Sequence, residues 1–177
     1  MTATTDELRD MTALVARIKH AYGAVEQAAN GLSDEQLTAP GPDGGWSIKD
    51  HLAHLAVWRH SLIALLEGAD RKAAIGLDQQ PAGETANSDD IDDVNAILYQ
   101  RNHDRAPADV QADFRQAQER VLAILGGMSD ADLEKPYSHY QPDAENTSDD
   151  PVVGWIVGNT YGHDEEHLAT IQALAGR

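Results

Sequence analysis

The sequence predicts an all-α fold, an up-down bundle of four long helices with long connections and short extra helices. Three observations predict this class. Apolar residues recur at helical spacing in four long segments. Glycine or proline lies at the boundaries of these segments. The composition favours helices, because alanine, leucine and glutamine are plentiful and only 5% of residues are aromatic. We expect residues 1–177 to form one domain with a substantial core.

The first long helix is predicted from about residue 5 to about residue 30. Thr4 and Glu7 form a capping box at its start, and Asn30-Gly31 closes it. Its apolar stripe consists of Leu8, Met11, Leu14, Val15, Ile18, Tyr22 and Val25. A second capping box, in Ser33-Asp34-Glu35-Gln36-Leu37, predicts a short turn of helix after the first one.

The second long helix follows Trp46, with Ser47 as its cap and Asp50 at the matching capping position. Gly68 ends this helix. Its apolar stripe consists of Ile48, Leu52, Leu55, Leu62, Ile63 and Leu66. Two histidines, His51 and His54, lie along one flank of that stripe.

The middle of the chain is less regular. Residues 69–90 are rich in glycine, proline, asparagine and aspartate, and we expect a partly irregular excursion there. A short helix is predicted from residue 91 to about Arg101. Pro107 suits the first turn of a third long helix, which Gly126-Gly127 ends. Another capped turn follows at Ser129-Asp130-Ala131-Asp132-Leu133, and then a polar loop from Pro136 to Asp150.

The fourth long helix is predicted to begin at Pro151. Its apolar side consists of Val152, Val153, Ile156, Val157, Leu168, Ile171 and Leu174. His163 and His167 are four residues apart, so both imidazoles leave the same face about one turn apart. That spacing allows two nitrogens to reach one metal ion.

The two halves of the chain share a pattern. Gly31–Leu37 resembles Gly127–Leu133, and each is followed by a loop, a Gly-Trp pair and a helix. The tryptophan lies eight residues before a histidine in both halves, Trp46 before His54 and Trp155 before His163. Two copies of this unit would form a bundle with pseudo-twofold character, in which the two histidines occupy equivalent positions.

These patterns predict a metal site built from His54, His163 and His167. Three imidazoles on facing helices leave open coordination positions, the arrangement typical of catalytic rather than structural sites. Zinc, nickel and iron(II) all suit such ligands. The ion would activate a bound water or a thiolate. The alternative is that the histidines are simply solvated residues of an acidic helical protein.

Two neighbouring residues leave the ligand set open. His51 competes with His54, because it lies closer to the centre of the apolar stripe, whereas the spacing from the tryptophan favours His54. Three roles are open for Asp164: a fourth ligand, a group that orients an imidazole, or a solvated carboxylate. The segment His163–His167 also matches the H-x-x-E-H protease signature. Only ten residues follow it, too few for the further ligand that such proteases need.

Charge and composition exclude several partners. Asp and Glu outnumber Lys and Arg by 30 to 13, for a net charge of −17, so nucleic acid and anionic membrane surfaces are not expected as partners. Cysteine is absent, which excludes disulfides and thiolate ligands. The N-terminus has no signal-peptide pattern. We therefore expect a soluble, cytoplasmic protein that acts on a small molecule.

Three parts of the chain carry a resemblance to a known family: Gly45-Trp46-Ser47-Ile48-Lys49-Asp50-His51-Leu52-Ala53-His54-Leu55 with Trp58 beyond it, the run from Asn95 through Arg101 to Phe114, and His163 with His167. They resemble the DinB-like superfamily of four-helix bundles and, within it, the ClbS/DfsB branch. The resemblance covers nearly the whole chain. It implies the handedness and the helix order of the bundle.

The resemblance also implies a metal site with one histidine from the second helix and two ligands four residues apart on the fourth, which are His54, His163 and His167 here. Related metalloenzymes are thiol-dependent, among them mycothiol-dependent maleylpyruvate isomerase and bacillithiol transferases. The ClbS-like branch includes a self-resistance protein that hydrolyses a reactive cyclopropane in a genotoxin. Many members are homodimers, and a homodimer is expected here.

The chain departs from the thiol-dependent enzymes in its charge. Few basic residues are available to hold the carboxylates of a thiol cofactor, and the nearest candidates by pattern are Arg59, Arg101 and Arg105. The leading interpretation is a metal-dependent enzyme that uses water or a low-molecular-weight thiol to attack an electrophilic small molecule. The alternative is a non-catalytic binding or self-resistance protein of the ClbS/DfsB type.

Overall fold

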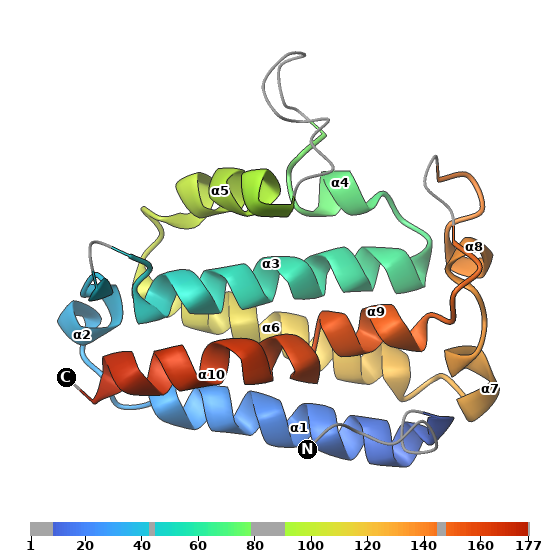
Figure 1. Cartoon of the computed structure of the whole chain (residues 1–177), viewed down its shortest axis with the longest axis horizontal. Helices are drawn as coiled ribbons and strands as arrows, with labels where there is room; N and C mark the ends of the chain where they lie inside the picture. Colours follow the sequence, from blue (N-terminus) through green and yellow to red (C-terminus); the bar gives the residue numbers. More distant parts are fainter. Residues whose placement is uncertain (1–8, 43–44, 79–90, 145–147, 177) are drawn as a thin grey trace.

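The computed structural model describes residues 9–42, 45–78, 91–144 and 148–176. Four long helical segments lie side by side (Figure 1): α1 (Met11–Ala29), α3 (Ile48–Glu67), α6 (Pro107–Leu125), and a fourth made of α9 (Val153–Gly158) and α10 (Tyr161–Ala175). The shorter helices are α2 (Asp34–Thr38), α4 (Arg71–Ala74), α5 (Ile91–Asn102), α7 (Asp130–Leu133) and α8 (Tyr137–Tyr140). The described ranges contain no strand. The predicted all-α fold is confirmed.

The long second connection determines the direction of the helices. It passes through α4 and α5, which lie across α3 and return the chain to the end where α3 began (Figure 1). As a result α3 and α6 run parallel, whereas α10 runs antiparallel to α3 and parallel to α1. Two side-chain contacts confirm the parallel pair: Arg59 of α3 binds Gln118 of α6, and Glu67 near the end of α3 binds Arg120.

The capping signals in the sequence correctly locate α3. The backbone N–H of Asp50 donates to Ser47 Oγ at 3.2 Å, and the N–H of Ser47 donates to the Asp50 carboxylate at 3.0 Å, which is a complete capping box. Gly68 ends the helix with φ of 70°, a left-handed conformation that glycine adopts without steric cost. The end of α1 at Ala29 and the cap of α2 at Ser33 also follow the sequence pattern.

One predicted boundary changes, and two predicted features lie wholly or partly outside the described residues. The first helix begins at Met11, not near residue 5, because the Asp10 side chain accepts a hydrogen bond from the backbone N–H of Ala13 at 3.0 Å. The predicted capping box of Thr4 and Glu7 lies outside the described residues. Of the excursion predicted for residues 69–90, residues 79–90 also lie outside them, and the remainder contains α4.

The fourth helix is broken, so the single continuous helix predicted from Pro151 is wrong. The break is at Asn159 and Thr160, whose φ and ψ angles are −111° and 7°, and −130° and −115°. Their side chains donate to the carbonyl oxygens of Trp155 and Ile156, at 2.8 Å and 2.5 Å. Asparagine and threonine compete in this way with the backbone hydrogen bonds of a helix. The interruption falls directly before the two histidines of α10.

The predicted polar loop from Pro136 to Asp150 is partly helical and partly buried. It contains α8, and Tyr137 is only 7% exposed. The Tyr137 ring packs on Trp155 of α9 with 4.8 Å between the ring centroids. Consequently Trp155 has a different role from Trp46, which lies beside the histidine His54 at 5.0 Å. The shared pattern of the two halves therefore predicts the element order but not equivalent tryptophans.

The core consists of two apolar clusters. One includes Leu14, Leu62, Val121 and Ile156, and the other includes Val25, Leu52, Phe114 and Ile171. Three buried polar side chains, Arg59, Gln118 and Asp164, lie on helix segments between the residues of these two clusters, and four buried or half-buried histidines, His51, His54, His163 and His167, lie close by on α3 and α10. We call this set the polar layer. It contains the candidate site.

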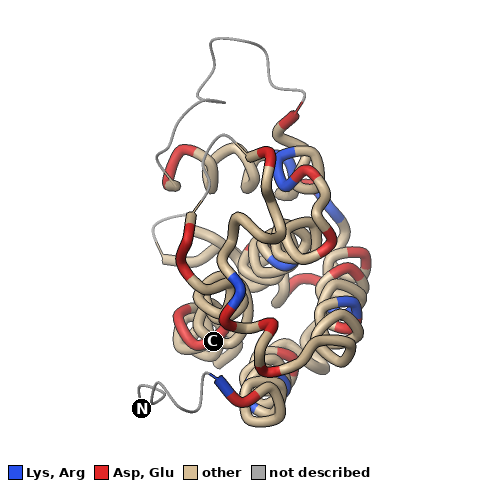
Figure 2. Tube along the Cα trace, turned by 90° about the vertical axis from the view of Figure 1, so that its right-hand side faces the viewer, with Lys and Arg blue, Asp and Glu red and all other residues tan. Residues whose placement is uncertain are grey.

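Charge and hydropathy agree with the sequence. In Figure 2, acidic positions are spread over helices and connections, and the fewer basic positions are scattered among them. Over the described residues, every helix is too short or too polar to traverse a lipid bilayer.

Candidate metal centre

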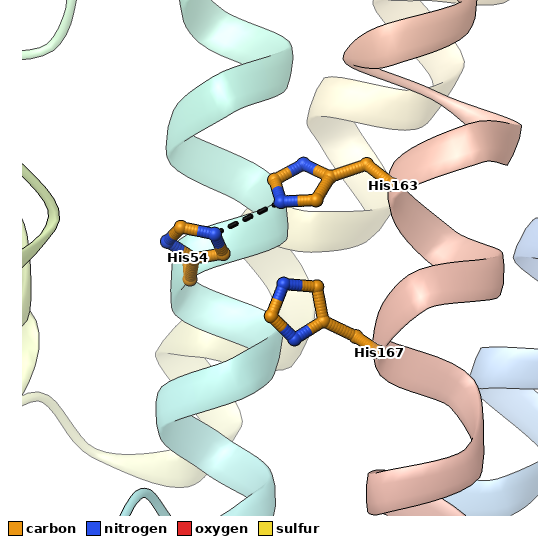
Figure 3. A group of neighbouring side chains, drawn as sticks. All are labelled: His54, His163 and His167. Atoms are coloured by element: carbon orange, nitrogen blue, oxygen red, sulfur yellow. Dashed lines mark hydrogen bonds between the residues drawn. The ribbon is translucent and has the colours of Figure 1, made fainter. Parts of the chain in front are cut away.

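Two antiparallel helices bring four histidines together. His51 and His54 lie on α3, one turn apart, and His163 and His167 lie on α10, also one turn apart. Because the helices run in opposite directions, His54 faces His163 and His51 faces His167. Figure 3 shows three of these rings, His54 from one helix and His163 and His167 from the other, pointing into the space between α3 and α10.

The predicted ligand set is close-packed. The Nε2 atoms of His54 and His163 are 2.9 Å apart. One nitrogen from each of His54, His163 and His167 lies within 4.8 Å of the other two. Two nitrogens bound at about 2.0–2.1 Å to a single ion are separated by about 3 Å, so the spacing of His54 and His163 fits a shared metal ion.

The structure separates the roles of His51 and His54. His51 Nδ1 is 2.9 Å from His167 Nδ1, and this hydrogen bond leaves the Nε2 of His167 to face His54 and His163 (Figure 3). His51 therefore contacts the Nδ1 side of His167, away from the other two candidate ligands. If His167 binds an ion through Nε2, its Nδ1–H donates to His51, which orients the ring. In the cluster of close nitrogens, the histidine from α3 is His54 and not His51.

Burial keeps these rings neutral. Burial, reinforced by the neighbouring histidines, lowers the pKa of His54 from 6.5 to about 2 and that of His51 to about 4. The pKa of His163 falls to about 3, first through burial and then through the charges of His167 and Arg59. Burial also lowers the pKa of His167. A neutral imidazole is the form that binds a metal, so protons do not compete for these nitrogens near pH 7.

We expect the metal-free protein to lose stability between pH 7 and pH 5. In the unfolded chain these histidines bind protons below about pH 6.5, whereas in the folded state they stay neutral. The unfolded state then holds more protons, so the free energy of unfolding falls as the pH drops from 6.5 towards the folded pKa values. The slope has an upper limit of about 1.4 kcal/mol per pH unit for each histidine.

Urea unfolding in EDTA at pH 5, 6 and 7 measures this slope. The His54→Ala variant should show a shallower slope, because one proton-linked group is lost. A free energy of unfolding that stays constant from pH 7 to pH 5 would show that the rings are not kept neutral by burial.

The remaining ring nitrogens also bear on whether the residues fit an ion. The Nδ1 atoms of His54 and His163 are buried, and neither has a hydrogen-bond partner among the described residues. Buried polar atoms without partners are costly. In the close Nε2 contact, one nitrogen must also donate its only proton to the other. A divalent cation held by His54 and His163 would use the lone pairs of both Nε2 atoms and would replace this contact, so the donor set fits a divalent metal.

A buried ion pair holds α10 against α3 beside this cluster. The Nη2 of Arg59 donates to both oxygens of Asp164, at 2.8 Å and 2.7 Å, and both residues are 0% exposed. The Nε of Arg59 donates to Gln118 at 3.0 Å, and its guanidinium lies 4.7 Å from the centre of the Phe114 ring. Burial raises the pKa of Asp164, and the charge of Arg59 opposes that rise.

This pair corrects two expectations from the sequence. Asp164 is not solvated, and both oxygens of its carboxylate accept hydrogen bonds from Arg59. Arg59 is in turn committed to Asp164 and is not placed to hold a cofactor. Arg105 binds the Asp113 carboxylate at 2.8 Å, and Arg101 donates to the carbonyl oxygen of Gly76. The three arginines suggested by pattern are therefore engaged elsewhere.

A pocket of about 730 Å³ opens beside the histidines. Among the described residues, those that line the pocket lie on or next to α3, α5, α9 and α10. They are Trp46, His54, Trp58, Ile91, Asp92, Asn95, Ala96, Gly158, Asn159, His163, Glu166 and His167. No lysine or arginine is among these lining residues. Asn95, Asn159 and Glu166 line the pocket but were not predicted as site residues. For Glu166, the available signal was its position directly before His167 in the chain.

Trp58 fixes one wall of the pocket. Its indole Nε1–H donates to the side-chain oxygen of Asn95 at 3.1 Å, which ties α5 to α3. Trp46 forms another wall, and its ring stacks on Tyr99 of α5 with 5.5 Å between the centroids. The long second connection thus supplies one wall of the pocket through α5.

Replacing His51 by alanine should weaken metal binding without abolishing it. The variant keeps the three candidate ligands but removes the hydrogen-bond partner of His167 Nδ1, and loss of such a partner typically costs about 10–100-fold in affinity. Competition with a chromogenic zinc chelator measures the change. Unchanged affinity would show that His51 has no influence on His167, and complete loss would show that His51 is itself a ligand.

Comparison with known proteins gives a family match and two structural matches. A model of the DinB superfamily matches residues 17–171. A crystal structure of a protein from Streptococcus pneumoniae has a TM-score of 0.72 at 13% identity and covers 98% of this chain and 91% of that one. An uncharacterized protein from Clostridium difficile 630 has a TM-score of 0.71 at 13% identity, with coverage of 93% and 94%. No curated protein matches the chain. At this identity the two structures show a shared fold.

Proposed function

The chain belongs to the DinB superfamily, a metal-binding family, and on this premise we propose that it is a metal-dependent enzyme acting on an electrophilic small molecule. His54, His163 and His167 are the proposed ligands of a divalent ion, which is zinc, nickel or iron(II). The reaction is hydrolysis of the electrophile, or transfer of a low-molecular-weight thiol to it.

The single observation that supports this proposal is the convergence of three neutral imidazoles beside an open pocket. The His54 and His163 nitrogens are 2.9 Å apart, and the pocket leaves space for a substrate next to them. A divalent ion bound there would supply Lewis acidity, lowering the pKa of a water or thiol and polarising the substrate.

The pocket residues have separable roles in this proposal. The rings of Trp46 and Trp58 offer apolar walls on which a substrate can pack. The side chain of Asn159 is committed to the Trp155 carbonyl oxygen, so it shapes the wall. Glu166 is exposed and lines the pocket next to His163 and His167. Its carboxylate is proposed to accept the proton that the nucleophile loses.

The lining also bears on the nucleophile. Asp92 and Glu166 are acidic, and no basic side chain is present in the described lining. A thiol that carries carboxylates would meet repulsion there and find no arginine or lysine to bind it. The pocket therefore favours water, or a thiol without acidic groups.

Hydrolysis of 4-nitrophenyl acetate by the zinc-loaded protein tests the proposal. Glu166→Gln should lower kcat by about 100-fold or more, the usual contribution of a general base, with zinc content unchanged. Glu165→Gln is the matched control, because Glu165 binds Arg17 of α1 at 3.2 Å and does not line the pocket. Equal kcat in both variants would remove Glu166 from the proposed reaction. Absence of zinc-dependent turnover in the unsubstituted protein would count against the enzyme itself.

A second candidate is a non-catalytic binding or self-resistance protein of the ClbS/DfsB type. The two tryptophan walls and the 730 Å³ volume favour it, because they suit retention of an apolar molecule. Counting molecules of a reactive electrophile consumed per chain distinguishes the two. One molecule per chain supports sequestration, and many molecules exclude it. Membership of that branch and the expected homodimer both stay predictions.

A further inference from the structure

A second cavity, of about 670 Å³, lies on the other side of Trp58 from the histidines. It is enclosed by the C-terminal half of α3, the segment with α4, the start of α5, and the segment from α8 to Ala144. We call it the Arg71 cavity. Ser61, which lines it, is seven residues after His54 on α3 and therefore about 10 Å away along the helix axis. The Arg71 cavity and the histidine pocket share the Trp58 wall.

Arg71 is the unusual group in this cavity. Its side chain is half-buried. The Nε donates to Ser61 Oγ at 3.0 Å, and Nη1 donates to Tyr137 Oη at 3.3 Å. Both partners are neutral hydroxyls, and no carboxylate among the described residues forms an ion pair with Arg71. A half-buried guanidinium is thus held in a defined position with no counter-charge from the described part of the chain.

The geometry leaves one edge of the guanidinium available. Of the five N–H groups of an arginine, Nε–H and one on Nη1 are used by the two hydroxyls. The remaining three groups, one on Nη1 and two on Nη2, have no partner among the described residues and can donate to the oxygens of a carboxylate. The stacking of the guanidinium over the Tyr137 ring, 5.8 Å from its centre, further limits its movement.

The acidic side chains of the cavity do not neutralise Arg71. Asp70 lines the cavity, but its carboxylate caps α4 by accepting from the backbone N–H groups of Lys72 and Ala73, at 2.8 Å and 3.2 Å. Asp143 also lines the cavity without an ion pair to Arg71. The rest of the lining is mainly apolar or aromatic and includes Trp58, Ile75, Leu77, Val94, Tyr137 and Tyr140.

We propose that the Arg71 cavity binds a small organic carboxylate with an apolar or aromatic body. The carboxylate binds the free edge of Arg71, and the body packs against Trp58, Val94 and Tyr140. In a chain with a net charge of −17, a positioned cation is needed to bind an anion at all, because the surrounding field repels it. The site is distinct from the histidines and does not require a metal.

Calorimetric titration of the full-length, EDTA-treated protein with 2-naphthoate and with its uncharged amide, 2-naphthamide, tests the proposal. EDTA removes any ion that could bind the carboxylate at the histidines. We expect 1:1 binding of naphthoate at submillimolar concentration and at least about tenfold weaker binding of the amide, because a hydrogen bond to a charged group is lost. Equal affinity for the two probes, or no naphthoate binding up to millimolar concentration, would overturn the proposal.

Two variants locate the site. Arg71→Gln should reduce naphthoate binding to the level of the amide. Arg115→Gln is the matched control, because Arg115 lies on α6 and is largely exposed, and it should bind naphthoate normally. Unchanged naphthoate affinity in Arg71→Gln would place the binding elsewhere and refute the proposal. If Arg71→Gln melts at a lower temperature, Ser61→Ala gives the second reading. It keeps the charge but releases Nε, and should weaken naphthoate binding while leaving amide binding unchanged.

Discussion

His163→Ala protein loaded with zinc is expected to retain less than about a tenth of the metal that the unsubstituted protein retains after dialysis. Loss of an orienting partner typically costs about 10–100-fold in affinity, and loss of one of only three ligands should cost more. The apo-variant should fold, because the substitution removes a ring whose buried Nδ1 has no partner among the described residues. Elemental analysis, with a thermal melt of the metal-free sample, measures both effects.

His20→Ala is the control for this experiment. His20 lies on α1 and is exposed, so its removal should change neither zinc content nor melting temperature. Full zinc content in His163→Ala would eliminate His163 as a ligand and would leave the close contact with His54 as an ordinary hydrogen bond. If His163→Ala loses both zinc and its fold, its zinc content does not test the ligand set. The zinc content of His54→Ala is then measured as the test of the three-histidine site.

Asp164→Ala should destabilise the metal-free protein by about 3–5 kcal/mol, the usual effect of removing one partner of a buried ion pair. The substitution leaves the guanidinium of Arg59 fully buried without its carboxylate. For a chain of this size, such a loss corresponds to a decrease in melting temperature of roughly 10 °C. Urea unfolding at pH 7 measures the change directly.

The double variant Arg59→Met, Asp164→Leu separates the cost of an unpaired charge from the value of the pair. Apolar replacement of both partners often restores stability, so the double variant should be more stable than Asp164→Ala. A double-mutant cycle made of Arg59→Met, Asp164→Leu and this double variant gives the coupling energy. If Asp164→Ala unfolds at the same urea concentration as the unsubstituted protein, the ion pair does not contribute to stability as described.

Local signals in the sequence predict much of the fold. The Ser47 capping box, the left-handed Gly68 and Pro107 at the first turn of α6 each depend on a few adjacent residues. Helical periodicity favoured His51, whereas the eight-residue spacing from Trp46 favoured His54, which is the residue found in the cluster of close nitrogens. The same reasoning failed at Asn159 and Thr160. The periodic apolar pattern continues through these residues, and it gives no sign that their side chains compete for backbone carbonyl oxygens.

The rest of the site depends on contacts between distant parts of the chain. Arg59 and Asp164 are separated by 105 residues. The sequence around each residue contains no signal that the two will form an ion pair. The hydrogen bond between His51 and His167 likewise depends on how α3 and α10 meet. The role of α5 as a pocket wall was hidden, because its helical pattern reveals nothing about the direction in which it crosses α3.

The polar layer also bears on the alignment of α3 against α10. Two apolar helix faces can slide past each other by one turn, about 5.4 Å, and still bury similar side chains. Such a slip would separate Arg59 from Asp164, and both charges would be buried alone. The ion pair therefore favours one alignment of the two helices over the others. In that alignment His54 contacts His163. We infer that the double apolar variant can remain stable yet lose this uniqueness, which would appear as conformational exchange at the histidines before any loss of helix content.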